Sequence, residues 1–229
     1  IGAGFMGYGI ALNLIKNKYN VFVVAHKNRK PINKLIKKGA KEKKNIKELA
    51  ETCSLIIMCV TNTPIAKNVI NKIIPYIDKN STIIDITTHK FDGSIFIYNK
   101  LKKHNINYIE SPVMGGPVQA EKGILGAIVG CDKKHFARVK KILMSFCKDV
   151  FYFGEIGMGA KAKLISNFLS LGTTTFVIES LKAAKKNKIN MKKFYEVAKL
   201  GSGNSGALDR IAPQILNNNY KGYIFTVNN

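Results

Sequence analysis

The chain has 229 residues, of which 46% are hydrophobic, and it carries a formal net charge of +23. A chain of this length can bury one large core or two modest ones, and it has no run of about 18 apolar residues, so we expect no membrane span. Its basic residues include only three arginines, Arg29, Arg138 and Arg210; because nucleic-acid readers rely on arginine for bidentate contacts, specific nucleic-acid binding is not favoured.

The chain opens with a glycine-rich turn that fits the spacing G-x-G-x-x-G. In this spacing the first glycine permits a tight turn, the second lets the backbone approach a pyrophosphate, and the third lets helix and strand pack closely. The helix expected to follow would point its free N–H groups at the phosphates. The alternative is a glycine-rich turn in another kind of α/β protein. The turn predicts dinucleotide binding through Gly2, Gly4, Phe5, Met6 and Gly7.

A dinucleotide turn needs a strand before it. Only Ile1 precedes Gly2, and the last residues, 225–229, give no signal that ends a domain. We therefore expect the sequence to be a fragment.

The end of the next expected strand, residues 21–25, indicates which dinucleotide is preferred. NAD sites carry a carboxylate there, which accepts hydrogen bonds from the ribose hydroxyls. Here the strand is followed by His26, Lys27 and Arg29, and the first acidic residue of the chain is Glu42. The cations favour the 2′-phosphate of NADP, with NAD as the alternative; the lysines can also be ordinary solvated side chains.

Short apolar runs alternate with helical patterns over about the first 150 residues, which is typical of a doubly wound parallel sheet. The run from Leu55 to Val60 is apolar throughout, which indicates a strand buried on both faces. We expect strands at residues 21–25, 55–60, 82–86, 108–109, 124–129 and 151–153. We expect helices at residues 7–18, 30–38, 64–76, 91–103 and 133–146.

Polar residues follow two of these strands. Thr61 and Asn62 come after the run that ends at Val60, and Thr87 and Thr88 end the next strand. Ligands of open α/β sheets bind at the carboxyl ends of the strands. We therefore expect Thr61 and Asn62 to border the nicotinamide, and one of the two threonines to contact the nicotinamide ribose.

A loop with adjacent glycines follows the strand at residues 108–109. Gly115 and Gly116 can expose backbone N–H groups as a nest for an anion, and Pro112 and Pro117 would stiffen the loop. We expect these N–H groups to hold a substrate carboxylate beside an apolar wall made by Met114. The alternative is an ordinary strand-to-helix turn.

Lys163 and Asn167 are spaced i, i+4 near the start of a long helical pattern, so both lie on one helix face. A lysine whose pKa is lowered by burial can exchange a proton with a hydroxyl or carbonyl oxygen. We expect Lys163 to act as general acid or base and Asn167 to orient it or the substrate. The alternative is a pair of polar residues on a surface helix.

The pattern changes from strands and helices to helices alone near residues 154–159. We therefore expect a dinucleotide-binding domain at residues 1–156 and a helical domain at 157–229, incomplete in this sequence. Its helices are expected at residues 160–187, 191–199 and 206–217, with a further strand at 222–227.

The cysteines and histidines show no spacing typical of a metal site, a disulfide framework or a catalytic triad. We expect no metal, and a reducing compartment: the cytoplasm, with the mitochondrial matrix as the alternative. The residues concerned are Cys53, Cys59, Cys131, Cys147, His26, His89, His104 and His135.

Four of these segments, taken in order, resemble the β-hydroxyacid dehydrogenases, which include 3-hydroxyisobutyrate dehydrogenase and the tartronate, glyoxylate and succinic semialdehyde reductases. Two positions differ: Met114 stands where the family has serine or threonine, and Ser166 where it often has the first of two asparagines. The segments are residues 2–7 with Ala11, Asn13 and Leu14, then 85–88, 110–116 and 157–167.

The resemblance implies a Rossmann-type domain followed by an all-helical domain, which in this family commonly pairs with a partner subunit as a homo-oligomer. It implies hydride transfer between NADP, or NAD, and a small β-hydroxy acid or its semialdehyde. Two alternatives stay open: a catalytically silent protein that docks on nucleic acid, and a 6-phosphogluconate-type dehydrogenase.

Overall fold

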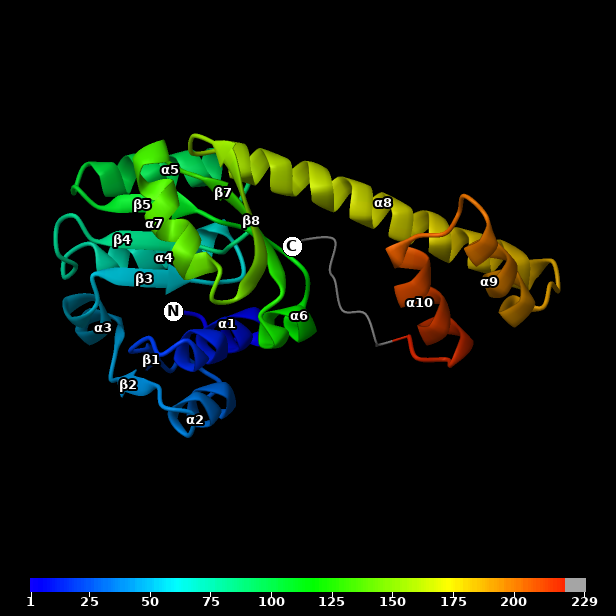
Figure 1. Cartoon of the computed structure of the whole chain (residues 1–229), viewed down its shortest axis with the longest axis horizontal. Coiled ribbons are helices and arrows are strands. Elements are labelled where there is room, and N and C mark those ends of the chain that lie inside the picture. Colours follow the sequence, from blue (N-terminus) through cyan, green and yellow to red (C-terminus); the bar gives the residue numbers. More distant parts are fainter. Residues whose placement is uncertain (221–229) are drawn as a thin grey trace. The chain divides into compact units, whose positions relative to one another are not determined.

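The computed structural model describes residues 1–220 and divides the chain into two compact units, residues 1–163 and residues from 164 onward. Figure 1 shows the elements of both units. The change of pattern in the sequence predicts a domain boundary at residue 156. The division lies seven residues later, because the start of the long helix that links the units packs with the first one.

The first unit contains the strands, and the short apolar runs of the sequence form most of them. They are β1 (Phe22–Val24), β2 (Lys41–Lys43), β3 (Leu55–Met58), β4 (Thr82–Asp85), β5 (Asn107–Glu110), β6 (Val113–Met114), β7 (Leu125–Gly130) and β8 (Cys147–Gly154). Its helices are α1 (Phe5–Lys16), α2 (Lys30–Ile36), α3 (Ile46–Thr52), α4 (Thr63–Ile73), α5 (Phe91–Lys102), α6 (Pro117–Lys122) and α7 (Lys133–Leu143).

The main sheet has the strand order β3-β4-β5-β7-β6, with β8 beside β7. Strands β3, β4 and β5 are parallel, as expected, but β7 runs antiparallel to β5 and β6. The connection from β6 to β7, residues 115–124, is shorter than the dozen or so residues that a parallel crossover needs. The chain therefore turns back as a hairpin around α6.

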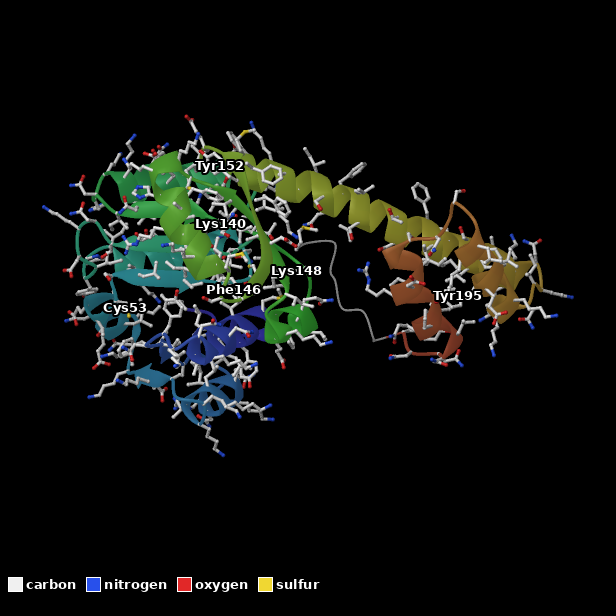
Figure 2. The ribbon with its side chains drawn as sticks, in the orientation of Figure 1. Cys53, Lys140, Phe146, Lys148, Tyr152 and Tyr195 are labelled. Atoms are coloured by element: carbon white, nitrogen blue, oxygen red, sulfur yellow. The ribbon has the colours of Figure 1, made fainter. Side chains whose placement is uncertain are left out.

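Helices cover both faces of this sheet, as the doubly wound pattern predicts. Ile83 and Ile84 are neighbours on β4, so they point to opposite faces. Ile84 packs in one core cluster with residues of α1 and α7. The same cluster contains Phe146, which follows α7 (Figure 2). Ile83 packs in a second cluster with residues of α3, α4 and α5. Strand β4 is buried at every residue for this reason.

Strands β1 and β2 pair only with each other in the described residues and form a separate two-stranded sheet. A cavity of about 130 Å³ lies between Val21–Val23 and Leu55–Ile57, with Gly2 also on its wall.

The second unit is helical, as expected. Helix α8 (Met158–Lys186) is followed by α9 (Met191–Leu200) and α10 (Gly206–Leu216). Val177 and Leu181 of α8 pack against Leu208 and Ile211 of α10. The Tyr195 hydroxyl of α9 (Figure 2) donates to Asp209 of α10 at 3.2 Å. The strand expected at residues 222–227 lies outside the described residues.

Among the described residues, one helix, α8, has the length and the apolar composition that a membrane-crossing helix needs. From the absence of a long uninterrupted apolar run, no membrane span was expected. A helix that packs against another subunit can meet the same two criteria, so length and composition do not separate a membrane helix from an interface helix.

Helix α1 packs closely against the short helix α6. Gly9 of α1 faces the backbone of Ala120, where a Cβ on Gly9 would come within 2.5 Å of the Ala120 carbonyl carbon. One turn later, the buried Asn13 amide donates to the carbonyl oxygens of Ala120 and Glu121 at 2.8 and 3.0 Å. These contacts tie the glycine turn to the loop of Met114 and Gly115.

The substitution Gly9→Ala should lower the free energy of unfolding by about 1–3 kcal/mol, because the added methyl group collides with backbone that cannot move aside. The control is Gly172→Ala on α8, where a Cβ meets no atom within 4 Å. That change should stabilise the helix by roughly 0.5–1 kcal/mol. Urea unfolding of both variants measures the difference, and equal midpoints would contradict the close packing of α1 on α6.

Candidate active site

The glycine turn fits a pyrophosphate. A Cβ on Gly2 would collide with the carbonyl oxygen of Cys59, and one on Gly7 with the carbonyl oxygen of Gly2, so the turn closes only with glycine. A Cβ on Gly4 would meet no atom within 4 Å, so a ligand can approach the backbone there. Gly4 is also the N-cap of α1 and offers no side chain to its first turn. The N–H groups and dipole of α1 therefore favour an anion at this point.

Two further residues of the turn differ in their surroundings. Phe5 is 85% exposed, whereas Met6 is half-buried and packs on the core beneath the sheet. Phe5 thus offers an apolar face beside the phosphate site, and Met6 anchors the turn.

The residues that follow β1 form an exposed basic segment. His26, Lys27 and Arg29 are all exposed. Arg29 is already paired, because its guanidinium donates to the Glu42 carboxylate on β2 at 2.9 Å. Glu42 is the first acidic residue of the chain, 13 residues after Arg29, and that separation in sequence gave no sign of the contact. The parallel pairing of β1 with β2 brings it back beside Arg29.

The polar residues after β3 and β4 have different roles in the structure. Asn62 is the N-cap of α4, and its side chain accepts from the Ile65 N–H at 3.1 Å. The Thr87 hydroxyl is buried and accepts from the Val60 N–H at 3.1 Å, so it holds the end of β3. Thr61 is exposed and Thr88 is half-buried. Of the two threonines, Thr88 is therefore the one open to a ligand.

A buried polar network lies beneath these strand ends. The His89 ring contacts Asp85 at 2.8 Å through Nε2 and the Thr63 hydroxyl at 2.9 Å through Nδ1. The Tyr108 hydroxyl donates to the same Asp85 carboxylate at 3.2 Å. Thr63 begins α4, so this network ties the start of α4 to the end of β4. Sequence reasoning gave His89 no role, because its partners lie on other elements.

The expected substrate residues lie at the end of β6, which is Met114, and in the loop that follows it. Gly115 has a φ of 112°, which favours glycine, and Gly116 is the N-cap of α6. The Gly116 N–H donates to the Gln119 side chain at 3.0 Å. A carboxylate can take this N–H only if the exposed Gln119 side chain moves away. Gln119 is a residue that sequence reasoning did not identify.

Lys163 of α8 reaches this loop. Its Nζ lies 3.4 Å from the Met114 sulfur, and the residue is only 9% exposed. Burial lowers the pKa of the Lys163 side chain. Asn167 is half-buried, lies four residues further along the same helix and belongs to the second unit. The structure thus brings Lys163 together with Met114, two residues far apart in the sequence.

A buried carboxylate meets the start of α8. Glu110, at the end of β5, is 1% exposed, and its Oε1 accepts from the N–H groups of Gly157 and Gly159 at 2.7 Å each and of Ala160 at 3.3 Å. Burial raises the pKa of Glu110, and the Ser94 side chain and the N–H groups of α8 offset this rise in part. The sequence around Glu110 gave no signal of this contact, because the partners of Glu110 follow about 50 residues later.

Comparisons with known proteins agree with this architecture. Residues 1–154 match the protein family described as the NAD binding domain of 6-phosphogluconate dehydrogenase. The 2-(hydroxymethyl)glutarate dehydrogenase of Eubacterium barkeri is 24% identical and aligns with 91% of this chain and 70% of its own. The chloroplastic glyoxylate/succinic semialdehyde reductase 2 of Arabidopsis thaliana is 27% identical, with 96% of this chain and 62% of its own covered.

A similar fold occurs in a solved structure described as Psf3 in complex with NADP+ and 2-OPP. It is 22% identical, has a TM-score of 0.88, and covers 97% of this chain and 80% of its own. The match over residues 1–154 extends from the glycine turn to the end of β8. The chain belongs to the β-hydroxyacid dehydrogenase family, whose members are NAD(P)-dependent oxidoreductases.

Proposed function

We propose that this protein is an NADP-preferring oxidoreductase that interconverts a small β-hydroxy acid and its semialdehyde, with Lys163 as general acid or base. The observation that carries the proposal is the buried Lys163 amine beside the loop of Met114 and Gly115. A lysine kept from water in this way can change its charge near neutral pH, which a solvated lysine cannot.

When bound, the nicotinamide supplies or accepts the hydride. The chain's own residues bind the remaining groups: the glycine turn and the start of α1 bind the phosphates, and Thr88 lies at a strand end open to the ribose. Lys163 takes the proton from the substrate hydroxyl as it becomes a carbonyl, and returns it in the reverse direction. Asn167 orients the amine or the substrate.

The substrate carboxylate binds to the N–H groups of Gly115 and Gly116 once the Gln119 side chain has moved away. Met114 gives the pocket an apolar wall where relatives of this family have a hydroxyl. A thioether is a weak hydrogen-bond acceptor and donates none. We therefore expect a semialdehyde with hydrogen or methyl next to the carbonyl to be a better substrate than one with a further hydroxyl.

The full chain should oxidise NADPH with glyoxylate, succinic semialdehyde or methylmalonate semialdehyde, and more slowly with tartronate semialdehyde; absorbance of the reduced nicotinamide measures this. Tight NADPH binding without turnover would favour a silent binding protein. In that case docking on nucleic acid should weaken steeply as salt rises. Turnover of 6-phosphogluconate alone would favour the phosphosugar dehydrogenases. A reducing compartment, the cytoplasm or the mitochondrial matrix, fits the four free cysteines.

An apolar stripe on α8 supports a homo-oligomer. Ile165, Phe168, Leu169 and Phe176 are 70%, 81%, 71% and 74% exposed. Phe168, Leu169 and Phe176 follow Ile165 by three, four and eleven residues, so the four side chains share one helix face. We propose that a second copy of this chain covers this stripe.

Lys163→Met should lower kcat by roughly 10²- to 10⁴-fold, which is the usual contribution of a general acid or base, and leave the Kd of NADPH unchanged. In the wild type, oxidation needs the neutral amine, so its rate should rise with pH through the lowered pKa of Lys163, and the reduction rate should fall. The control is Lys161→Met on the same helix, because the Lys161 amine does not face Met114. It lies over the Phe91 ring, 4.3 Å from the ring centre. Equal loss in both variants would contradict the assignment.

Arg29→Ala should raise the KM for NADPH several-fold and leave the KM for NADH unchanged, because only NADPH carries the 2′-phosphate. Glu42→Gln should lower the KM for NADPH, because an exposed ion pair of about 0–1 kcal/mol no longer competes for the guanidinium. Steady-state kinetics with both cofactors tests the pair. An unchanged NADPH:NADH ratio in Arg29→Ala would count against the basic segment as the phosphate site.

Phe168→Glu should shift the protein toward monomer, as measured by light scattering after gel filtration, because a charge would lie in an apolar interface. Lys185→Glu, in the last turn of α8, is the control and should not change the mass. A monomeric wild type, or binding of the wild type to lipid vesicles that Phe168→Glu abolishes, would contradict the proposed interface.

A further inference from the structure

The start of α8 is held by a single oxygen atom. Helix N-termini leave several backbone N–H groups without an intrahelical partner. Here the N–H groups of Gly157, Gly159 and Ala160 converge on Oε1 of Glu110. Because all of these atoms are buried, water cannot take the place of the carboxylate, and α8 is fixed to the end of β5.

Glycines on two elements make room for this carboxylate. A Cβ on Gly130 of β7 would collide with Oε1, and one on Gly159 would lie 3.0 Å from it. Gly157 has a φ of 95°, and a Cβ there would collide with the Phe91 ring at the start of α5. The turn into α8 therefore has one arrangement, set by the length of the Glu110 side chain.

Lys163 lies four residues after Gly159, which is one helical turn further on the same face. A helix is stiff over one turn, so the position of its start sets the position of the lysine. The Lys163 amine meets Met114, two strands away from Glu110 in the sheet order. The hydrogen bonds to Glu110 and the contact of Lys163 with Met114 thus fix the position of the first turns of α8 at two points.

The second carboxylate oxygen of Glu110, Oε2, has no hydrogen-bond partner in the part of the chain that the structure describes. Only Oε1 therefore accepts from the N–H groups of α8, and the side-chain amide of glutamine has an equivalent accepting oxygen. The amide NH₂ would take the place of Oε2 and leave the accepting oxygen in the place of Oε1. A glutamine at this position should therefore keep the helix start in place, and an alanine should not.

We propose that Glu110 is a positioning residue that fixes the first turn of α8, so that the Lys163 amine lies beside the reacting oxygen. The inference rests on the proposed role of Lys163 as general acid or base. It adds a residue that contacts neither substrate nor cofactor and acts only through the helix that carries the lysine.

The experiment compares Glu110→Ala, Glu110→Gln and Gly159→Ala in the full chain. Glu110→Ala should lower kcat by about 10²-fold, the effect of moving a catalytic group by about 1 Å, with the Kd of NADPH unchanged. Glu110→Gln should keep kcat within a few-fold of the wild type. Gly159→Ala, which pushes the helix start away from Oε1 but favours the helix itself, should repeat the loss of kcat if Glu110→Ala does not fold.

A second measurement does not depend on activity. NMR of ¹³C-labelled lysine, assigned with Lys163→Met, follows the titration of Lys163. In Glu110→Ala and Gly159→Ala its pKa should rise toward that of a solvated lysine. The control is Leu101→Ala, a core substitution in α5 that destabilises the fold without touching α8; it should change neither kcat nor the titration.

The outcomes separate the two proposals. A loss of kcat in Glu110→Ala no larger than in Leu101→Ala, or an unchanged titration of Lys163, overturns the role of Glu110. A shifted titration together with full turnover of Lys163→Met supports the hold of Glu110 on Lys163 and overturns the role of Lys163 in catalysis.

Discussion

One buried carboxylate oxygen carries the geometry of the candidate active site. Glu110 ends β5 and accepts from the first N–H groups of α8, so the longest helix of the protein begins from the centre of the sheet. Positions 130 and 159 are glycines, and a Cβ at either one would enter the space that the Glu110 carboxylate fills. Because Lys163 follows one turn later, the proposed chemistry of Lys163 would depend on a contact that lies outside the site.

The other parts of the site are connected to the same sheet edge. Asp85, in register with Glu110, joins the end of β4 to the start of α4 through His89. Asn13 joins the helix of the glycine turn to α6 and its loop. Each contact links a cofactor or substrate segment to a rigid neighbour by hydrogen bonds between buried groups. Such bonds are costly to leave unmade, so they keep the segments in one arrangement.

The elements predicted from the sequence are those with a strong periodic pattern, such as β3, β4 and α8. The short elements β2, α3, β6 and α6 were not predicted, because each has seven residues or fewer, too few to show a clear hydrophobic period. Asn45 and Glu48 were a usable signal for the start of α3, since the Asn45 side chain caps that helix. The antiparallel direction of β7 depended on α6, and was missed with it.

The glycine turn was recognisable because its chemistry depends on local spacing. Three contacts of the site depend instead on tertiary or side-chain geometry, which the spacing of residues does not encode. They are the ion pair of Arg29 with Glu42, the hydrogen bond of Gly116 with Gln119, and the hydrogen bonds of Glu110 with the start of α8.

The glycines around Glu110 also limit how this protein can vary. An alanine at position 130 is incompatible with a glutamate at 110, but a shorter aspartate would leave room for the methyl group and lose its reach to α8. A side chain at 130 or 159 therefore competes with Glu110 for the same space, although these positions lie far apart in the sequence. Glutamine is the substitution at 110 that keeps both the length of the side chain and the accepting oxygen, so a library of single substitutions should retain glutamate or glutamine at 110 and only glycine at 130 and 159.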